Sequence, residues 1–286
     1  MVRGVVAIAV GLASVACAKN SRPVSKEPAA RIVSLSPNTT ETLFAIGAGQ
    51  RLVGRSRFCD YPPNVKSLPS VGGYVDPSLE AILALAPDLV VGARGPAGPA
   101  LVEKLGALGI GTFFPSTESM GEIDAMIEQV GARVGTAENA REVVASLRSR
   151  RDEVARAVAK EPRVRVLLVF GIVPIVSAGP GSFPDEMLAI ANAQNVVTTG
   201  TGYPTLSVER LIALNPDVIV NASMAGTPDD RGDGIRRDDP GWRELVAVRE
   251  GRIVAIHDEA VLRPGPRIGE GLAVLARALH PHASVP

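Results

Sequence analysis

Short apolar runs and longer stretches of helical periodicity alternate along most of the chain. The apolar runs are of the kind that is buried in parallel sheets, and they lie at 31–36, 52–54, 110–114, 163–170 and 252–256. The stretches between them repeat apolar residues at helical spacing, which predicts helices at 37–46, 101–108, 120–134 and 269–279. This alternation predicts an α/β fold with mainly parallel sheets.

One helix–strand unit occurs twice. Residues 74–91 read YVDPSLEAILALAPDLVV and residues 203–220 read YPTLSVERLIALNPDVIV, at a constant offset of 129 residues. In each copy a residue type that favours helix N-caps, Asp76 or Thr205, precedes an apolar stripe. A Pro-Asp pair then ends the helix before a short apolar strand. A repeat of this length is too long for a solenoid and predicts two similar lobes.

A long segment without Gly or Pro separates the two copies. Residues 136–160 carry apolar side chains at helical spacing, interrupted at Arg151. A helix over 137–160 would be about 36 Å long at 1.5 Å per residue, which is enough to bridge two lobes. We therefore predict an N-terminal lobe at 31–136, one long interdomain helix, and a C-terminal lobe at 161–286.

The first 30 residues are predicted to lie outside the fold. Residues 1–17 have the basic start and short apolar run of a secretory signal, too short to span a bilayer. The sequence from Ser14 to Cys17 is similar to a bacterial lipobox with Cys17 as the lipidated residue, although Ser14 departs from the usual apolar residue. Ordinary cleavage at 16–18 also fits. With a polar tether at 18–30, we expect an exported protein, either periplasmic or anchored to the membrane by a lipid.

Composition bears on partners and on cysteine chemistry. The 30 basic and 30 acidic side chains give zero formal net charge, which argues against a nucleic-acid-binding surface. If Cys17 is lipidated or removed, Cys59 has no disulfide partner, and we expect it to be a small buried residue. Aromatic residues make up only 3% of the chain, so a tyrosine near a predicted ligand site is a stronger candidate for ligand contact.

The sequence carries none of the common catalytic signatures. It lacks the Gly-x-Ser-x-Gly turn, the phosphate loop and the Gly-x-Gly-x-x-Gly dinucleotide motif. Two of the three histidines, His280 and His282, lie near the chain end, where we expect fraying. No spacing supplies the three or four converging ligands of a metal site. We therefore expect a binding protein rather than an enzyme, with no metal or cofactor of its own.

Polar and aromatic residues follow several of the predicted strands. The carboxyl ends of strands are where open α/β sheets bind ligands. The candidates at these ends are Ser36, Thr39, Asp60, Tyr61, Tyr74, Ser182, Tyr203, Glu259, Arg263 and Arg267.

Several segments together resemble one family. They are RIVSLSPNTTETLFAIGAG, RFCDYPP, the repeat, GPGSFPDEMLAIANAQNVV and DPGWRELVAVREGRIVAI, which extend over about 31–279. These segments resemble the helical-backbone periplasmic binding proteins that serve ABC importers of cobalamin, haem and iron–siderophores. The resemblance implies a monomer with two rigid lobes, a ligand in the cleft between them, and a metal, cobalt or iron, that arrives inside the ligand.

The resemblance also implies a partner in the membrane. In such proteins one glutamate on each lobe docks into arginine pockets of the permease dimer, and Glu80 and Glu209 match those places. The alternative is that the two glutamates only stabilise their helices, because each lies in a first helical turn, where a negative charge complements the helix dipole. Ligand contacts implied by the resemblance fall on Tyr61, Tyr74, Tyr203, Glu259 and Arg263, and the end of the first predicted strand adds Ser36.

Among the family's ligands, the sequence is most similar to cobalamin-binding members. They carry Trp where this chain has Tyr74, Tyr203 and Ala93, so the cleft here is expected to be smaller and more hydroxylated. Haem with a tyrosine phenolate on iron is one alternative. A siderophore held by Arg94, Arg263 and Arg267 is another. An α/β enzyme that uses the same cleft is the least favoured interpretation.

Overall fold

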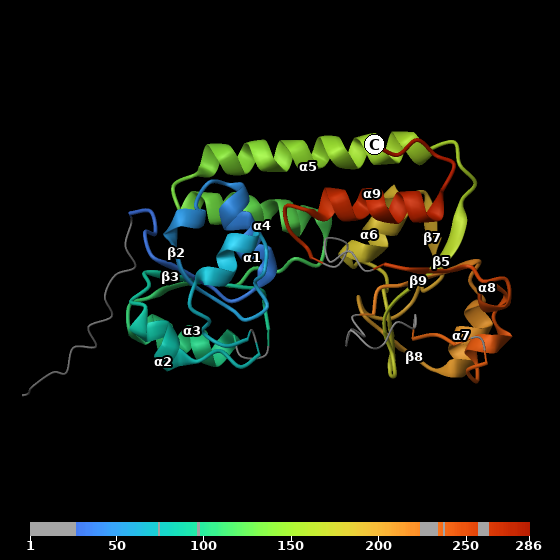
Figure 1. The fold of residues 1–286 in the computed structure, drawn as a ribbon, viewed down its shortest axis with the longest axis horizontal. Coiled ribbons are helices and arrows are strands. Elements are labelled where there is room, and N and C mark those ends of the chain that lie inside the picture. The colour runs from blue at the N-terminus through green and yellow to red at the C-terminus, as the bar shows by residue number, and fades with distance from the viewer. Residues whose placement is uncertain (1–26, 74, 96–97, 224–233, 237, 257–262) are drawn as a thin grey trace, which may run out of the picture.

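The computed structural model describes residues 27–73, 75–95, 98–223, 234–236, 238–256 and 263–286. Two α/β lobes lie side by side, and one long helix, α5, runs across both of them along one edge of the molecule (Figure 1). This arrangement confirms the predicted fold class. The division of the chain at 31–136 and 161–286 stays a prediction. Within the described ranges, no helix has both the length and the apolar character needed to cross a bilayer.

The N-terminal lobe is built on a parallel sheet. Among the described residues its strands are ordered β2-β1-β3-β4, and all three pairings are parallel. The central strands β1 and β3 are fully buried apolar runs, as their sequences predict. The strands are β1 (Ile32–Ser34), β2 (Leu52–Arg55), β3 (Leu89–Val91) and β4 (Gly111–Phe113). The helices are α1 (Pro37–Ala45), η1 (Gly49–Arg51), η2 (Pro63–Ser67), α2 (Leu79–Ala84) and α3 (Gly98–Ala107).

The C-terminal lobe has a mixed sheet in the order β10-β9-β5-β6-β8, with β7 also paired to β5. The pairs β5–β6 and β6–β8 are antiparallel, and the other pairs are parallel. The strands are β5 (Val164–Ile172), β6 (Ile175–Ser177), β7 (Ala193–Asn195), β8 (Thr205–Leu206), β9 (Val218–Asn221) and β10 (Ile253–Ala255). The helices are α6 (Phe183–Ile190), α7 (Val208–Leu214), η3 (Trp242–Glu244) and α8 (Val246–Arg249). The short strands β6, β7 and β8 were not predicted from the sequence.

Three further helices lie along the edge that joins the lobes. They are α4 (Met120–Arg133), α5 (Ala137–Val158) and α9 (Ile268–Leu279). Helix α5 has 22 residues, so it is about 33 Å long. Arg151, which interrupts its apolar stripe, pairs with Asp124 of α4 at 2.7 Å, with both side chains about nine-tenths buried. The interruption is therefore a paired charge within the α4–α5 contact and not a break in the helix.

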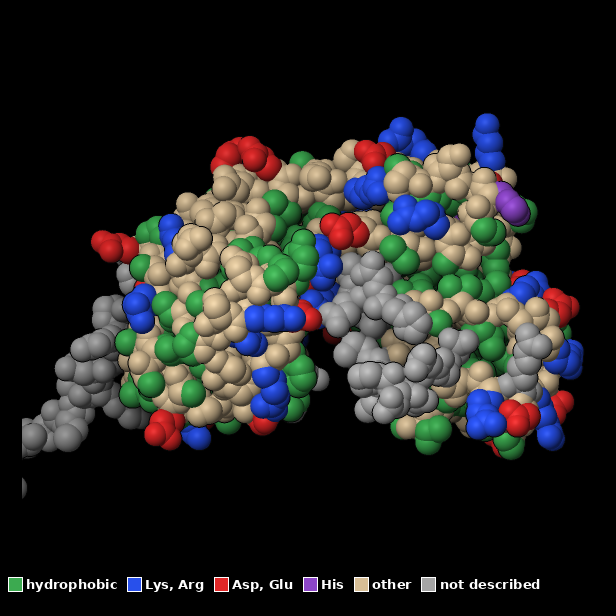
Figure 2. All heavy atoms as spheres, in the orientation of Figure 1, with side chains coloured by type: hydrophobic (Ala, Val, Ile, Leu, Met, Phe, Trp, Pro, Cys, Tyr) green, Lys and Arg blue, Asp and Glu red, His purple; other side chains and the backbone are tan. Residues whose placement is uncertain are grey.

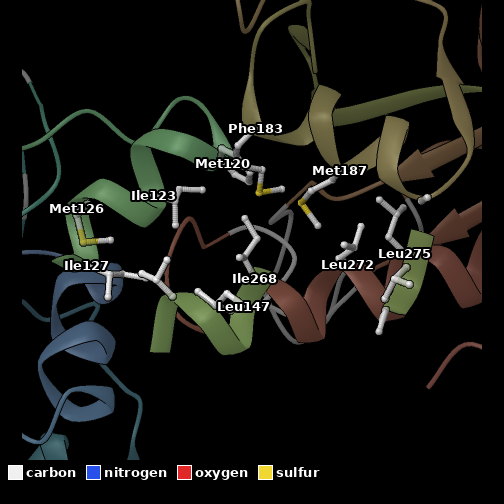
Figure 3. Close-up of a cluster of buried hydrophobic side chains, with 14 of the residues drawn as sticks. Met120, Ile123, Met126, Ile127, Leu147, Phe183, Met187, Ile268, Leu272 and Leu275 are labelled. Atoms are coloured by element: carbon white, nitrogen blue, oxygen red, sulfur yellow. The ribbon is translucent and has the colours of Figure 1, made fainter. Parts of the chain in front are cut away.

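The lobes also share one apolar core beneath α5. The largest cluster of buried residues extends without interruption from Ile32 in β1 to Val220 in β9. Figure 3 shows the part of it where α4, α5, α6 and α9 meet, with side chains from both lobes pointing toward one another. The labelled residues are Met120, Ile123, Met126, Ile127, Leu147, Phe183, Met187, Ile268, Leu272 and Leu275. Since packed interiors resist deformation, this core opposes bending between the lobes.

The two copies of the repeat start their helices in the same way, but not at the predicted caps. Ser78 and Ser207 are the N-caps, and each hydroxyl accepts a hydrogen bond 3.2 Å from the N–H three residues later. The predicted cap Asp76 instead pairs with Arg57, and Thr205 belongs to β8. Serine next to the first helical residue satisfies the free N–H groups, so the earlier residues are not needed as caps.

Two expectations about single residues had different outcomes. Cys59 is fully buried, as expected. The predicted fraying at His280 is wrong, because its side chain is buried and its Nε2 lies 2.8 Å from the Ala191 carbonyl oxygen. The imidazole therefore joins α6 to the chain end and stabilises that end.

Candidate ligand-binding site between the lobes

Side chains from both lobes meet along the boundary below the joining helices. Figure 2 shows a notch between the lobes that opens on the side away from α5. Two sets of contacts cross this boundary. We call the first the Glu41 cluster, formed by Glu41, Asp60, Tyr61, Arg263 and Arg267. The second joins the N-terminal end of α4 to the loops around Tyr203.

The centre of the Glu41 cluster is a buried carboxylate. Glu41 lies on α1, and its side chain is only 1% exposed. Arg263 Nη1 donates to Glu41 Oε1 at 2.8 Å, Arg267 Nε donates to Oε2 at 2.8 Å, and Arg267 Nη2 donates to Oε1 at 3.0 Å. The hydrogen bond to Glu41 raises the pKa of the Arg267 guanidinium. A buried charge needs such compensation, so these bonds tie the C-terminal lobe to α1.

The same arginines hold the loop that carries Tyr61. Arg263 Nη1 also donates to Asp60 Oδ1 at 2.8 Å. The Arg267 guanidinium lies over the Tyr61 ring, 4.0 Å from its centroid, which is a cation–π contact. Tyr61 keeps 43% of its surface exposed. The ring is therefore held at the lobe boundary with part of its surface exposed, and it lines a hollow together with Val143 and Leu147 of α5.

The segment before α9 lies directly against α1. Asn38 Nδ2 donates to the Pro264 carbonyl oxygen at 3.4 Å. A Cβ added to Gly265 would lie 3.4 Å from Asn38, within ordinary van der Waals contact. The backbone that leads from Arg263 to Arg267 therefore packs on the start of α1, close to Glu41.

Ser36 and Arg263 were both predicted to contact ligand. In the structure their side chains form hydrogen bonds with other groups of the protein. Ser36 is 3% exposed. Its hydroxyl donates to Asn38 Oδ1 at 2.6 Å and accepts from the Ala93 N–H at 2.8 Å. These bonds fix the end of β1 against the end of β3. Arg263 is 14% exposed and lies in the Glu41 cluster, so both residues act on the shape of the site.

Tyr203 is the tyrosine that the C-terminal lobe brings to the boundary. Its ring packs edge-on against Phe170, with centroids 5.7 Å apart, and 39% of its surface is exposed. Burial of the hydroxyl raises the pKa of Tyr203 far above the usual value, and the Glu118 carboxylate adds to the shift. Tyr203 is thus a protonated hydrogen-bond donor at neutral pH.

Other candidates fall outside the site or outside the described residues. Thr39 is buried and shares hydroxyl contacts with Ser34 and Ser36. Ser182 is the buried N-cap of α6, whereas Arg94 is exposed at the end of β3. Tyr74, Glu259 and Cys17, and with them His257, lie outside the described residues, so their predicted roles stay predictions. Among the described residues no group of three or more His, Cys, Asp or Glu side chains could hold a metal ion.

The two glutamates of the repeat lie on the surface, one on each lobe. Glu80 is in the first turn of α2 and Glu209 is in the first turn of α7, and both are exposed. Hydrogen bonds from its own N–H and from Ser207 lower the pKa of Glu209. The carboxylate at this position is therefore ionised over the whole neutral range.

Sequence reasoning missed Glu41 and Glu118. No sequence signal marks Glu41, because the burial of the stretch 38–43 is seen only in the structure. Glu118 directly precedes Ser119-x-x-Glu122, a capping box that marks the start of α4. That signal does not identify the partner of Glu118 in the other lobe.

Comparison with known families now adds to this geometry. Residues 32–260, most of the chain, match the family described as periplasmic binding protein. The chain belongs to this family. Membership confirms the resemblance seen in the sequence and the expectation that the protein works outside the cytoplasm.

Relatives of this periplasmic binding protein bind different ligands. It is 30% identical over 265 residues to YvrC of Bacillus subtilis, described as an uncharacterized ABC transporter substrate-binding lipoprotein, with 90% of this chain and 82% of that protein covered. The vitamin B12-binding protein BtuF of Vibrio cholerae matches with a TM-score of 0.73 and 28% identity, covering 88% and 97% of the two chains. The haem-binding protein RhuT of Roseiflexus sp. RS-1 matches with a TM-score of 0.77 and 29% identity, covering 88% and 98%.

Proposed function

We propose that this periplasmic binding protein captures a corrinoid, cobalamin in the first place, between its lobes and delivers it to an ABC importer. The observation that carries the proposal is the pair of exposed tyrosines at the boundary, Tyr61 from one lobe and Tyr203 from the other. Aromatic faces of this kind suit a flat macrocycle. Capture is non-covalent, the metal arrives inside the ligand, and no residue is assigned a catalytic role.

The pairing of two arginines supports a corrinoid over an anionic siderophore. The siderophore alternative needs arginines that face the ligand. Among the described residues, Arg263 and Arg267 instead pair with Glu41 and Asp60, which leaves Arg94 as the exposed arginine of the three. Arginines whose charge is compensated in this way attract an anionic ligand less strongly than free arginines.

The protonation of Tyr203 bears on the haem alternative. A tyrosine that ligates ferric iron does so as a phenolate, and burial raises the pKa of Tyr203. Iron ligation by this residue would therefore oppose its environment. Haem remains the second candidate because a relative of similar identity, RhuT, binds it.

Delivery to the importer would use the two exposed glutamates. Glu80 and Glu209 lie at equivalent places on the two lobes, which suits a permease dimer that presents one basic site per subunit. We also propose that the protein is a monomer and that a lipid on Cys17 provides its only attachment to the membrane.

A colour-retention experiment tests the proposed ligand. The purified mature protein is mixed separately with cyanocobalamin, haemin and a ferric hydroxamate siderophore, and is then desalted. We expect cyanocobalamin to stay with the protein. Retention of haemin alone would overturn the corrinoid assignment, and retention of none of the three would overturn capture of metal chelates.

A further inference from the structure

Glu118 of the N-terminal lobe faces the loop of the C-terminal lobe that carries Tyr203. It lies between β4 and α4, directly before the N-cap Ser119. Its Oε2 is 3.9 Å from the point that a Cβ on Gly202 would occupy. The Glu118 carboxylate also contributes to the raised pKa of Tyr203. A negative charge from one lobe thus lies next to the aromatic donor of the other.

The loop that carries Glu118 is held in place from its own side. Glu122 Oε2 accepts hydrogen bonds from Ser116 Oγ at 2.7 Å and from the Glu118 N–H at 2.8 Å. The Glu122 N–H in turn donates to Ser119 Oγ at 3.1 Å. The bond from Ser116 is the main reason why the pKa of Glu122 is lowered. The loop is therefore closed onto the first turn of α4.

The same helix end is also held by the C-terminal lobe. The Met120 N–H donates to Glu186 Oε2 of α6 at 2.8 Å. A carboxylate at a helix N-terminus is favoured by the helix dipole, so this contact fixes α4 against α6. Since Glu118 is two residues from this contact, the backbone that carries it is held close to the C-terminal lobe.

No cation neutralises Glu118 in the part of the chain that the structure describes. Among those residues none forms an ion pair with it within 4.0 Å. Arg94 acts electrostatically on the neighbouring carboxylate of Glu122, and Glu118 itself is exposed.

We propose that Glu118 sets the charge preference of the cleft. Its carboxylate beside Tyr203 favours a ligand that presents amide N–H groups there and disfavours a ligand that presents carboxylates. Corrinoids carry amide side chains, whereas haem carries two propionates. The inference rests on the proposed capture of a chelate between the lobes, and it adds the residue that separates neutral from anionic chelates.

Substitution of Glu118 by glutamine tests this role. Equilibrium dialysis measures the affinities of the full mature protein for cyanocobalamin and for haemin at low ionic strength. We expect E118Q to bind haemin roughly tenfold more tightly than the unaltered protein, because a like charge near the ligand is removed. Cyanocobalamin should change by less than about threefold, and added salt should shrink the haemin difference, since exposed charges are screened.

Glu103→Gln is the matched control. Glu103 is an exposed residue of α3, so the substitution makes the same change in net charge away from Tyr203. An equal gain in haemin affinity in E103Q, or an unchanged ratio of the two affinities in E118Q, would overturn the role of Glu118. Failure of the unaltered protein to retain either probe would instead overturn the proposed function, which keeps the two failures distinct.

Discussion

Removal of the Glu41 carboxylate should destabilise the protein more than the loss of any exposed ion pair. In Glu41→Ala, Arg263 keeps its contact with Asp60, but Arg267 loses both of its hydrogen bonds to Glu41. Breaking a buried pair by removing one partner costs about 3–5 kcal/mol, because the remaining charge is left without compensation. We expect a loss of about 3 kcal/mol, since part of the positive charge stays paired.

Urea unfolding followed by circular dichroism measures this loss. At a slope of about 3 kcal/mol/M, a loss of about 3 kcal/mol lowers the midpoint by about 1 M. Glu41→Gln removes the charge but keeps the shape and part of the hydrogen bonding. Its urea midpoint should therefore lie between those of the unaltered protein and Glu41→Ala.

An exposed ion pair provides the control for this experiment. Asp76→Ala breaks the pair with Arg57, whose two side chains are 47% and 56% exposed, and it should leave the midpoint unchanged. Midpoints of E41A and D76A that agree within error, at equal slopes, would refute the view that Glu41 ties the lobes together.

Three further predictions concern docking, titration and capping. The double variant E80A/E209A should bind ligand as the unaltered protein does, but it should abolish uptake by cells that rely on this importer. Unchanged uptake would contradict the docking role of the two glutamates. Tyr203 should ionise above the usual tyrosine range, because burial raises its pKa; the stability linked to this group is full below a pH of about 10 and is lost as pH rises toward the folded-state pKa. A near-ultraviolet absorbance titration of Tyr203→Phe should therefore lack the component at highest pH, and loss of a component in the ordinary range would contradict this. Ser207→Ala removes the N-cap of α7 and should cost about 1 kcal/mol in urea unfolding, whereas Ser146→Ala, within α5 and away from any cap, should not be destabilising; equal effects would speak against the cap.

The local pattern of the chain was sufficient for most of the fold. Helix α5 and the strands β1, β3 and β9 follow from apolar periodicity, because each buries one continuous stripe or run. The strands β6, β7 and β8 have only two or three residues each. Runs so short give no period of their own. The equally short β1 and β3 were predicted because they lie in the apolar run at 31–36 and in the repeat, whereas β6, β7 and β8 are strands through their pairing with β5 and with one another.

The site was predictable only in part, because its contacts join residues far apart in the chain. Tyr61 and Tyr203 stood out as rare aromatic residues near predicted strand ends. The bonds from Arg267 to Glu41 join positions 226 residues apart, and Glu118 meets Tyr203 only because α4 packs on α6. Such pairs depend on how two lobes are placed, which periodicity within either lobe does not determine.

The affinity for cyanocobalamin, measured with and without the two boundary tyrosines, tests the central claim most directly. We predict that the purified protein binds one cyanocobalamin per chain and that Tyr61→Ala combined with Tyr203→Ala weakens binding at least about tenfold, because two aromatic contacts with the macrocycle are lost. An unchanged affinity in the double variant, or no binding by the unaltered protein, would contradict capture of a corrinoid between these side chains.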